Sequence, residues 1–576
     1  MKSIFLGAFA ATLALSHAFP SPSLFKSRQA KPDLKNCNEA FFNKVIADNK
    51  LGGKLAPKSP YTPDTEPYEG TERVLYFANH EIGLSIDDIC GVRVMVTDNI
   101  AFELYLPNPT KWNKRFLTVG NGGFGGRTNR KDMFARAVYD WAAMSTNVGH
   151  EDASTSLKWA HNQPGLQEDW AYRAMQASVP YAKALVSAYY ANTKSLGNYY
   201  SGCSTGGRQG IRQIEVDPTS FDGMLIGAPA WNIKGFVPVI SRIGVLADTY
   251  NLKNTLADST LLGRIAQKLF AVCNSLDGSA GDMVIRDSDA CVAAVRKISQ
   301  NSTEWAGNNI SLKQVEGILA IVGQDFTNPK APGFVGDRFD ITGIYDMTNS
   351  AYLWDKSLTE NFNQQFAQYF LDGTVTTGTP LVWDADDNGA WLIGNMTSWD
   401  ERFHAQADPA KLAGGSGGYQ GKTILYTGTG DGFLATNGTR RAFTLAGGST
   451  NPNLAYFEIP GMSHCVDFQT GTGTSVNPPW YIGGVGLHLP PGNVTYMSRK
   501  DLVNAQHDAL MALAEWHESG PQGKRPESLL ATAFERWGPG ELKVSKKRPV
   551  CRVPKRQTLL SGGEARVNNE TAWSCQ

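Results

Sequence analysis

Ser204 lies between Gly202 and Gly206 in the segment GCSTGGRQG. A short apolar run precedes the serine and a helical pattern begins near Thr205. This order matches a nucleophile elbow, the sharp strand-to-helix turn that lifts a serine hydroxyl above a sheet. The turn needs small neighbours, and the positive end of the helix faces the reacting centre. The motif alone is weak evidence, because a chain with 59 glycines contains it about 0.4 times by chance.

A serine hydroxyl becomes a good nucleophile only when an imidazole accepts its proton and a carboxylate orients that imidazole. Asp431 follows the apolar run TILYTG (423–428), and His464 follows LAYFEIPG (454–461). Both runs read as strands, and a parallel α/β sheet presents functional groups where its strands end. The acid and then the base follow the serine in this kind of fold. We therefore predict a catalytic triad of Ser204, Asp431 and His464.

Each of these residues also has a structural reading. An Asp before a Gly is commonly a turn residue, and a single His is commonly a surface or capping group. The sequence offers rival bases at His404, His488, His507 and His517, and rival acids at Asp408 and Asp467. None of the rival histidines directly follows a strand pattern, so the spacing favours His464.

Two cysteines flank the predicted triad, because Cys203 precedes Ser204 and Cys465 follows His464. A disulfide between them would hold their Cα atoms about 4.4 to 6.8 Å apart and would place the serine beside its base. The chain has eight cysteines, which allow 105 pairings. The spacing alone therefore leaves the pairing open.

Acyl transfer also needs donors for the oxyanion that forms on the attacked carbonyl. The glycine-rich segment GNGGFGG (120–126) directly follows the predicted strand FLTV (116–119). We predict that the backbone N–H groups of Gly122 and Thr205 are the two donors. A phosphate-binding loop fits poorly, because no Lys with Ser or Thr follows and the dinucleotide spacing is missing.

Short apolar runs alternate with helical patterns around these motifs, which predicts an α/β fold with a parallel sheet. The predicted helices cover Trp170 to Tyr190, Thr205 to Val216 and Leu502 to His517. The predicted strands are FLTV, AAMS (142–145), YYSG (199–202), GMLIGAPA (223–230), TILYTG and LAYFEIPG.

The chain has 576 residues, which favours a large domain with an insertion. After Trp231 the pattern becomes helical, with scattered Gly and Asn, until the linker LAGGSGG (412–418). We predict an inserted domain over 232–415, and a discontinuous catalytic domain made of 19–231 and 416–576.

The first 18 residues, MKSIFLGAFAATLALSHA, read as a cleaved signal peptide, since their apolar stretch is too short to span a bilayer. Eight cysteines suit an oxidising compartment. Equal numbers of basic and acidic residues, 54 each, argue against a nucleic-acid partner. We predict a secreted, extracellular glycoprotein without a membrane anchor. Its six sequons are at Asn301, Asn309, Asn395, Asn437, Asn493 and Asn569.

Taken together, GCSTGGRQG, GTGD (428–431) and PGMSHC (460–465) resemble the Cys-Ser, Asp, His-Cys motif of the tannase and feruloyl esterase family. The resemblance runs from around Cys37 to Cys575 and includes NVGH (147–150), EDWAYRA (168–174) and SFDG (220–223), with CRVP and WSC near the end. It implies an α/β-hydrolase fold in which the inserted domain is a lid. It also implies the disulfides Cys203–Cys465, Cys37–Cys90, Cys273–Cys291 and Cys551–Cys575.

Many relatives in that family bind calcium in a lid loop of the form C-D-x-x-D-G-x-x-D-G, through hard oxygen ligands. This chain departs from the pattern, because its loop reads CNSLDGSAGDM (273–283). Candidate ligands are Asn274, Asp277, Ser279, Asp282 and Met283. Asp277 and Asp282 would bind through their carboxylates, and Ser279 and Met283 through their backbone carbonyls. Lost carboxylate charge weakens calcium binding, so the sequence leaves a structural calcium open.

The resemblance implies a secreted carboxylic ester hydrolase for esters of phenolic acids, of feruloyl esterase or tannase type, that uses no cofactor in catalysis. The substrate would be a small or polymer-linked phenolic ester. Alternatives are an esterase for another aromatic half-ester, such as the terephthalate type, or an inactive, lectin-like binding protein on the same scaffold. No motif fixes the lid residues that separate gallate from hydroxycinnamate esters, nor the oligomeric state.

Overall fold

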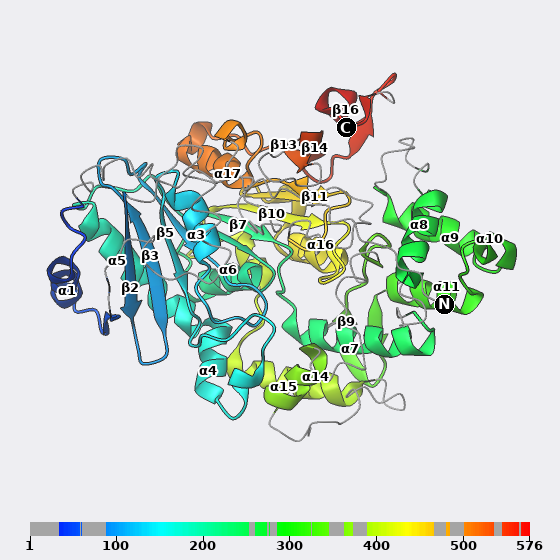
Figure 1. Ribbon diagram of the computed structural model, residues 1–576, viewed down its shortest axis with the longest axis horizontal. Helices are drawn as coiled ribbons and strands as arrows, with labels where there is room; N and C mark the ends of the chain where they lie inside the picture. Colours follow the sequence, from blue (N-terminus) through cyan, green and yellow to red (C-terminus); the bar gives the residue numbers. More distant parts are fainter. Residues whose placement is uncertain are drawn as a thin grey trace, which may run out of the picture.

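Figure 1 shows the computed structural model of the chain. The structure describes residues 34–57, 59, 88–252, 260–273, 276, 285–323, 325–344, 362–371, 389–465, 480–483, 500–534, 544–563 and 566–576. The predicted signal peptide, residues 1–18, lies outside this range. Within the described part, no helix is both long enough and apolar enough to cross a bilayer.

A nine-stranded sheet forms the centre of the molecule, in the order β1-β2-β3-β5-β4-β6-β7-β10-β11. The pairs β1–β2, β2–β3 and β3–β5 are antiparallel, and the other five pairs, from β5–β4 to β10–β11, are parallel. The strands are β1 (Lys54–Leu55), β2 (Ile89–Met95), β3 (Ala101–Pro107), β4 (Arg115–Val119), β5 (Ala142–Thr146), β6 (Gly197–Cys203), β7 (Gly223–Gly227), β10 (Lys422–Gly428) and β11 (Leu454–Ile459). This mostly parallel sheet with helices on both faces confirms the α/β prediction and has the α/β-hydrolase topology.

Alternate side chains of the strands enter two separate cores. On one face, Leu117, Tyr199 and Leu225 belong to a core that includes α3 (Arg130–Ala137) and α17 (Ala509–Glu518). On the other face, Tyr200 and its neighbours belong to a core that includes α1 (Glu39–Asp48), α5 (Ala174–Tyr189), α6 (Thr205–Val216) and α16 (Thr436–Leu445). Because successive side chains of a strand point to opposite faces, both faces of this sheet are apolar, and helices pack on both.

A long, mainly helical segment joins β7 to β10 and extends to one side of the sheet in Figure 1. Its apolar residues form a third core, which also takes in Phe124 and Trp170 from the sheet half of the chain. Residues near its end, in η3 (Pro409–Ala413), pack against α6 and α16. The domain boundaries at 232 and 415 therefore stay a prediction. The segment contains α7 (Ile233–Thr249), α8 (Leu261–Cys273), α9 (Ser288–Ile298), α10 (Ser302–Ala306), α11 (Leu312–Val322), β8 (Phe326–Asn328), β9 (Ala331–Gly336), α14 (Phe362–Tyr369) and α15 (Ala390–Phe403).

The end of the chain adds two small antiparallel sheets, made of β12 (Trp480–Tyr481), β13 (Ser528–Phe534) and β14 (Val544–Cys551), and of β15 (Gln557–Leu559) and β16 (Trp573–Cys575). The predicted helix over Leu502 to His517 is wrong at its start, because α17 begins at Ala509. Asp508 caps it by accepting hydrogen bonds from the N–H groups of Leu510 and Met511. A capping Asp marks where a helix begins, which apolar spacing alone does not.

Candidate active site

Ser204 occupies the turn between β6 and α6, as the elbow motif predicts. Its backbone has φ 61° and ψ −126°, a conformation that non-glycine residues rarely adopt. Two hydrogen bonds fix this conformation, because Ser204 N–H donates to the Gly227 carbonyl and Ala230 N–H donates to the Ser204 carbonyl, each over 3.0 Å. The neighbouring parallel strand β7 therefore supports the strained turn.

The two glycines of the elbow are needed because backbone segments meet there. A Cβ on Gly202 would lie 2.6 Å from the carbonyl oxygen of Gly206. A Cβ on Gly206 would lie 2.9 Å from the carbonyl oxygen of Asn121, in the glycine-rich loop after β4. Both distances are too short for a real Cβ contact, so the G-x-S-x-G spacing follows from packing around the serine.

Asp431 and His464 meet at the ends of β10 and β11. His464 Nδ1 lies 2.8 Å from Asp431 Oδ2, and the carboxylate is fully buried. The other carboxylate oxygen, Oδ1, accepts the N–H groups of Phe433 and Leu434 over 2.9 and 2.8 Å. When Nδ1 of a neutral imidazole donates to the carboxylate, Nε2 is left as the proton acceptor. This geometry suits a general base held in one tautomer.

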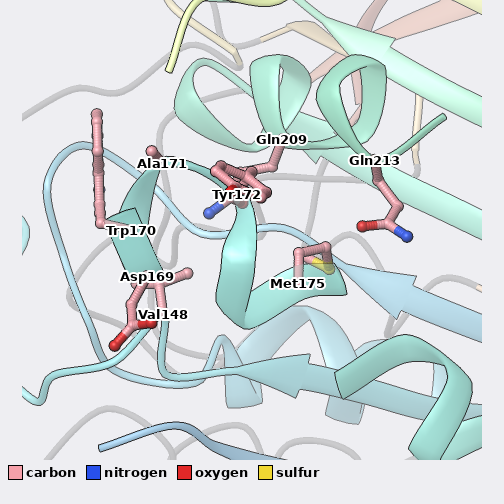
Figure 2. Close-up of a pocket in the computed structure, with 8 residues that line it drawn as sticks. All are labelled: Val148, Asp169, Trp170, Ala171, Tyr172, Met175, Gln209 and Gln213. Carbon is pink, nitrogen blue, oxygen red and sulfur yellow. The ribbon is translucent and has the colours of Figure 1, made fainter. Parts of the chain in front are cut away.

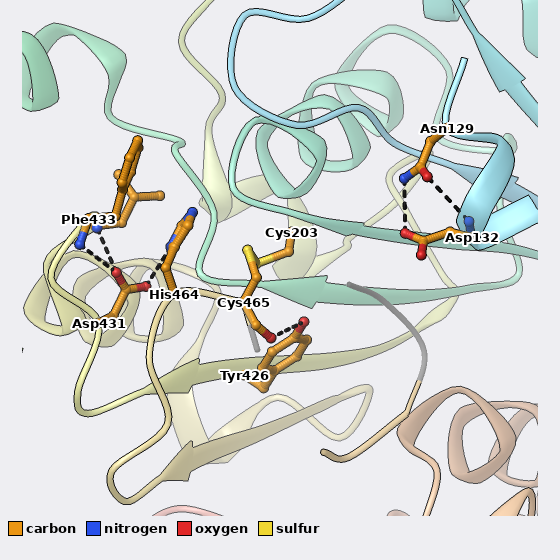
Figure 3. The surroundings of a disulfide bond; sticks show 9 residues. Asn129, Asp132, Cys203, Tyr426, Asp431, Phe433, His464 and Cys465 are labelled. Carbon is orange, nitrogen blue, oxygen red and sulfur yellow. Dashed lines mark hydrogen bonds and ion pairs between the residues drawn. A yellow bond between two sulfur atoms is a disulfide. The ribbon is translucent and has the colours of Figure 1, made fainter. Parts of the chain in front are cut away.

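Phe433 stacks on the imidazole of His464, with ring centroids 4.8 Å apart and an angle of 18° between the rings. In Figure 3, Phe433 and Asp431 both lie beside His464, on the side away from the Cys203–Cys465 disulfide. The stacking and the hydrogen bond restrict the ring in two directions. Motif reasoning missed Phe433, because no spacing rule places an aromatic residue two positions after the acid.

The Cys203–Cys465 disulfide joins the serine and histidine segments, with a Cα–Cα distance of 5.8 Å across a sequence separation of 262 residues (Figure 3). It links the residue before Ser204 to the residue after His464. The Cys465 carbonyl also accepts a hydrogen bond from Tyr426 of β10. The structure also contains the other three disulfides that the resemblance implies, namely Cys37–Cys90, Cys273–Cys291 and Cys551–Cys575.

The glycine-rich loop over 120–126 lies between β4 and α3, next to the start of α6. Its far end is fixed by two backbone hydrogen bonds, from Phe124 to Ser154 and from Gly126 to Asp152. Gly122 is exposed, and a Cβ there would meet nothing within 4 Å. Thr205 is the first residue of α6, so its N–H has no acceptor within the helix. The roles of Gly122 and Thr205 stay a prediction.

Comparison with known proteins connects this geometry to one family. A model described as tannase and feruloyl esterase matches residues 89–333, a range that includes the elbow and the glycine-rich loop. The chain is 26% identical over 518 residues to probable feruloyl esterase B-1 of Aspergillus oryzae, covering 84% of this chain and 83% of that relative. It is also 26% identical over 578 residues to feruloyl esterase B of Aspergillus niger, covering 97% and 99%. The chain is therefore similar to the tannase and feruloyl esterase family.

Solved structures agree with this similarity at the level of the fold. The crystal structure of feruloyl esterase B from Aspergillus oryzae superposes with a TM-score of 0.64 at 23% identity, covering 85% of this chain and 91% of that one. Tannin acyl hydrolase from Aspergillus niger gives 0.57 at 18% identity, covering 85% and 86%. The α/β-hydrolase fold of this chain is therefore shared with both.

The loop predicted to bind calcium lies almost entirely outside the described residues. Its candidate ligands Asn274, Asp277, Ser279, Asp282 and Met283 lie outside the described residues. Among the residues that the structure does describe, no group of three or more His, Cys, Asp or Glu side chains could hold a metal ion. Calcium binding stays a prediction.

The predicted glycosylation sites differ in their surroundings. Asn301, Asn309 and Asn569 are exposed, Asn395 is partly buried in α15, and Asn493 lies outside the described residues. The amide nitrogen of Asn437 donates to both carboxylate oxygens of Asp325, over 2.8 and 3.1 Å. A glycan needs that nitrogen, so the structure favours the exposed sites.

Proposed function

We propose that the protein is a secreted carboxylic ester hydrolase that cleaves esters of phenolic acids with Ser204, His464 and Asp431. The observation that carries this proposal is the Cys203–Cys465 bond, because it joins the strained serine turn to the segment that bears an aspartate-paired imidazole. A merely structural disulfide would not need a nucleophile beside one cysteine and a base beside the other.

In the first step, Ser204 Oγ attacks the ester carbonyl carbon while His464 Nε2 takes the hydroxyl proton. Asp431 stabilises the imidazolium that forms, and the N–H groups of Gly122 and Thr205 bind the oxyanion. The tetrahedral intermediate then breaks its bond to the alcohol oxygen, which leaves with the proton from His464. The phenolic acyl group remains as an ester on Ser204.

In the second step, water attacks the acyl-enzyme and gives one proton to His464. The new tetrahedral intermediate breaks its bond to Ser204 Oγ, which recovers that proton, and the phenolic acid leaves. The mechanism uses no cofactor. It explains why a neutral, oriented imidazole is needed in both steps.

The family and the names of the relatives support the substrate class. These names cover both feruloyl esterase and tannin acyl hydrolase, so the acyl group is a hydroxycinnamate or a gallate. The disulfides support an extracellular location, together with the predicted signal peptide and sequons. Extracellular esters of phenolic acids are small molecules or are attached to polymers, and the protein would act on either form.

The test compares hydrolysis of methyl ferulate and methyl gallate by the purified protein and by Ser204→Ala. Substituting the serine nucleophile lowers kcat by about 10⁶-fold in a well-studied serine protease. A serine-directed phosphonate should label the wild type on Ser204 and leave the variant unlabelled. Activity that survives in Ser204→Ala would refute the mechanism. A wild type that binds phenolic esters without hydrolysing them would indicate a binding protein instead.

A further inference from the structure

The two proposed oxyanion donors come from segments far apart in the sequence, the loop after β4 and the first turn of α6. Because both N–H groups must point at one oxygen atom, the distance between these segments decides whether the pair can work. The glycine contacts described above let the segments approach. They do not by themselves fix the position of the loop along the helix.

The side chain of Gln209, five residues after Ser204 on α6, connects the two segments. Its Oε1 accepts the backbone N–H of Asn121 over 2.9 Å, and its Nε2 donates to Asn121 Oδ1 over 3.3 Å. Asn121 directly precedes Gly122. One amide therefore binds both the backbone and the side chain of the residue next to the proposed donor.

Asn121 is held from its other side as well. Its Nδ2 donates to the carbonyls of Thr146 and Arg127, over 2.8 and 3.0 Å. Gln209 and Asn121 are only 3% and 4% exposed, so water has little access to these polar groups. Hydrogen bonds in such surroundings are costly to lose, because a buried donor is left unpaired.

We propose that Gln209 is a positioning residue that sets the loop bearing Gly122 against the start of α6 and so assembles the oxyanion site. This inference rests on the proposed function. Gln209 contacts no reacting atom, and it acts only through Asn121. A small shift of the loop would leave substrate binding intact and weaken the transition state selectively.

The same helix offers a matched control. Gln213 lies one turn further along α6, is 2% exposed, and with Gln209 lines the narrow space shown in Figure 2. Its Nε2 donates to Ser220 Oγ over 2.9 Å, in the connection to β7 and away from the glycine-rich loop. Each substitution removes one buried amide from α6. Of the two glutamines, only Gln209 contacts the glycine-rich loop over 120–126.

The experiment compares Gln209→Met with Gln213→Met, in the full-length protein. We expect Gln209→Met to lower kcat about 10- to 100-fold with KM changed less than about twofold, somewhat below the loss seen when an oxyanion donor is removed outright. Affinity for an arylboronic acid, which forms a tetrahedral adduct on the serine, should fall by the same factor. Affinity for the free phenolic acid should not change. Gln213→Met should keep the wild-type kcat.

Melting temperatures identify variants that fold poorly. If Gln209→Met does not fold, Gln209→Glu retains an acceptor for the Asn121 N–H while opposing Asn121 Oδ1, and should show the same selective loss. A wild-type kcat in a folded Gln209 variant, an equal loss in Gln213→Met, or a rise in KM at constant kcat would overturn the proposal. Failure of the proposed function is distinguishable, because the wild type itself would then resist the phosphonate.

Discussion

The two sides of the active site are built by different means. On the serine side, which comprises β6, Ser204, α6 and the loop over 120–126, backbone meets backbone at glycines. On the base side, which comprises the loops of Asp431 and His464 together with α16, side chains make the connections. Asp431 binds His464, Phe433 stacks on it, and Arg440 of α16 pairs with both Asp340 and Glu458. Apart from the contact between Gln209 and Asn121, the serine side should therefore be damaged by adding atoms, and the base side by removing groups.

Apart from replacing the nucleophile itself, the largest effect is expected on the base side. Asp431→Asn keeps the shape of the side chain but removes the charge and favours the wrong imidazole tautomer. We expect kcat to fall about 10⁴-fold, as for the equivalent change in a serine protease triad. Steady-state kinetics on a phenolic ester measures this loss. A decrease of only a few-fold would show that another residue orients His464.

Removing the disulfide tests whether the two sides need a covalent link. Replacing both Cys203 and Cys465 by Ser should cost about 5 to 6 kcal/mol of stability on the chain-entropy model, and should abolish most activity even where the protein still folds. The Cys551–Cys575 pair is the control, because it closes a loop of 24 residues. Its removal should cost about 3 kcal/mol and leave kcat unchanged. Equal effects of the two changes on kcat would contradict the comparison.

Adding one methyl group tests the serine side. A Cβ on Gly120 would lie 2.7 Å from the Cα of Gly206 and would also meet Tyr200, whereas a Cβ on Gly122 would meet nothing within 4 Å. We expect Gly120→Ala to lose about 1 to 3 kcal/mol of stability, together with activity. Gly122→Ala should fold like the wild type. Denaturant unfolding of both variants measures the difference, and similar stabilities would argue against backbone contact here.

The smallest effect is expected on stability, from the ionisation of Asp337 beside α16 at the border of the base side. Asp337 pairs with Arg441 of α16 at 3.0 Å, yet burial raises the pKa of Asp337 to about 6. The unfolded value is about 3.9, so both states are protonated below pH 4. Between about pH 4 and pH 6, Asp337 is mostly ionised in the unfolded chain but still mostly protonated in the folded one. The free energy of unfolding therefore falls as the pH rises through this range.

Asp337→Asn mimics the protonated form, so its stability relative to wild type should rise by about 1 to 3 kcal/mol between pH 4 and pH 7. Thermal unfolding at several pH values measures this change. Arg441→Met is a useful companion, because it removes the cation and should increase the cost of ionising Asp337. A stability difference between Asp337→Asn and wild type that does not vary with pH would contradict the assigned cause.

The sequence predicted the serine side well, because its constraints are local. The glycines at 202 and 206, the strand before them and the helix after them lie within twenty residues. The strand ends that carry Asp431 and His464 were also predictable from apolar runs. That these two strands are neighbours depends on the order of strands in the sheet, which apolar runs alone do not predict.

Other features could not be predicted because they depend on long-range pairing. Strand β3 is buried along its whole length, although Glu103 within it is charged, and Arg93 and Arg130 supply the compensating charges. The start of α17 depends on Asp508, whose carboxylate also binds the buried Arg136 over 2.7 Å. No spacing rule connects residues 372 positions apart.

The Cys203–Cys465 bond also has a consequence for proteolysis. It closes the chain into a covalent ring that contains Ser204, Asp431, His464 and the whole segment between β7 and β10. A single cut anywhere within that ring opens it without releasing a fragment, so a clipped molecule keeps its three proposed catalytic residues on one covalent body. If the protein is secreted, as proposed, it would keep this covalent connection after a single cut by an extracellular protease.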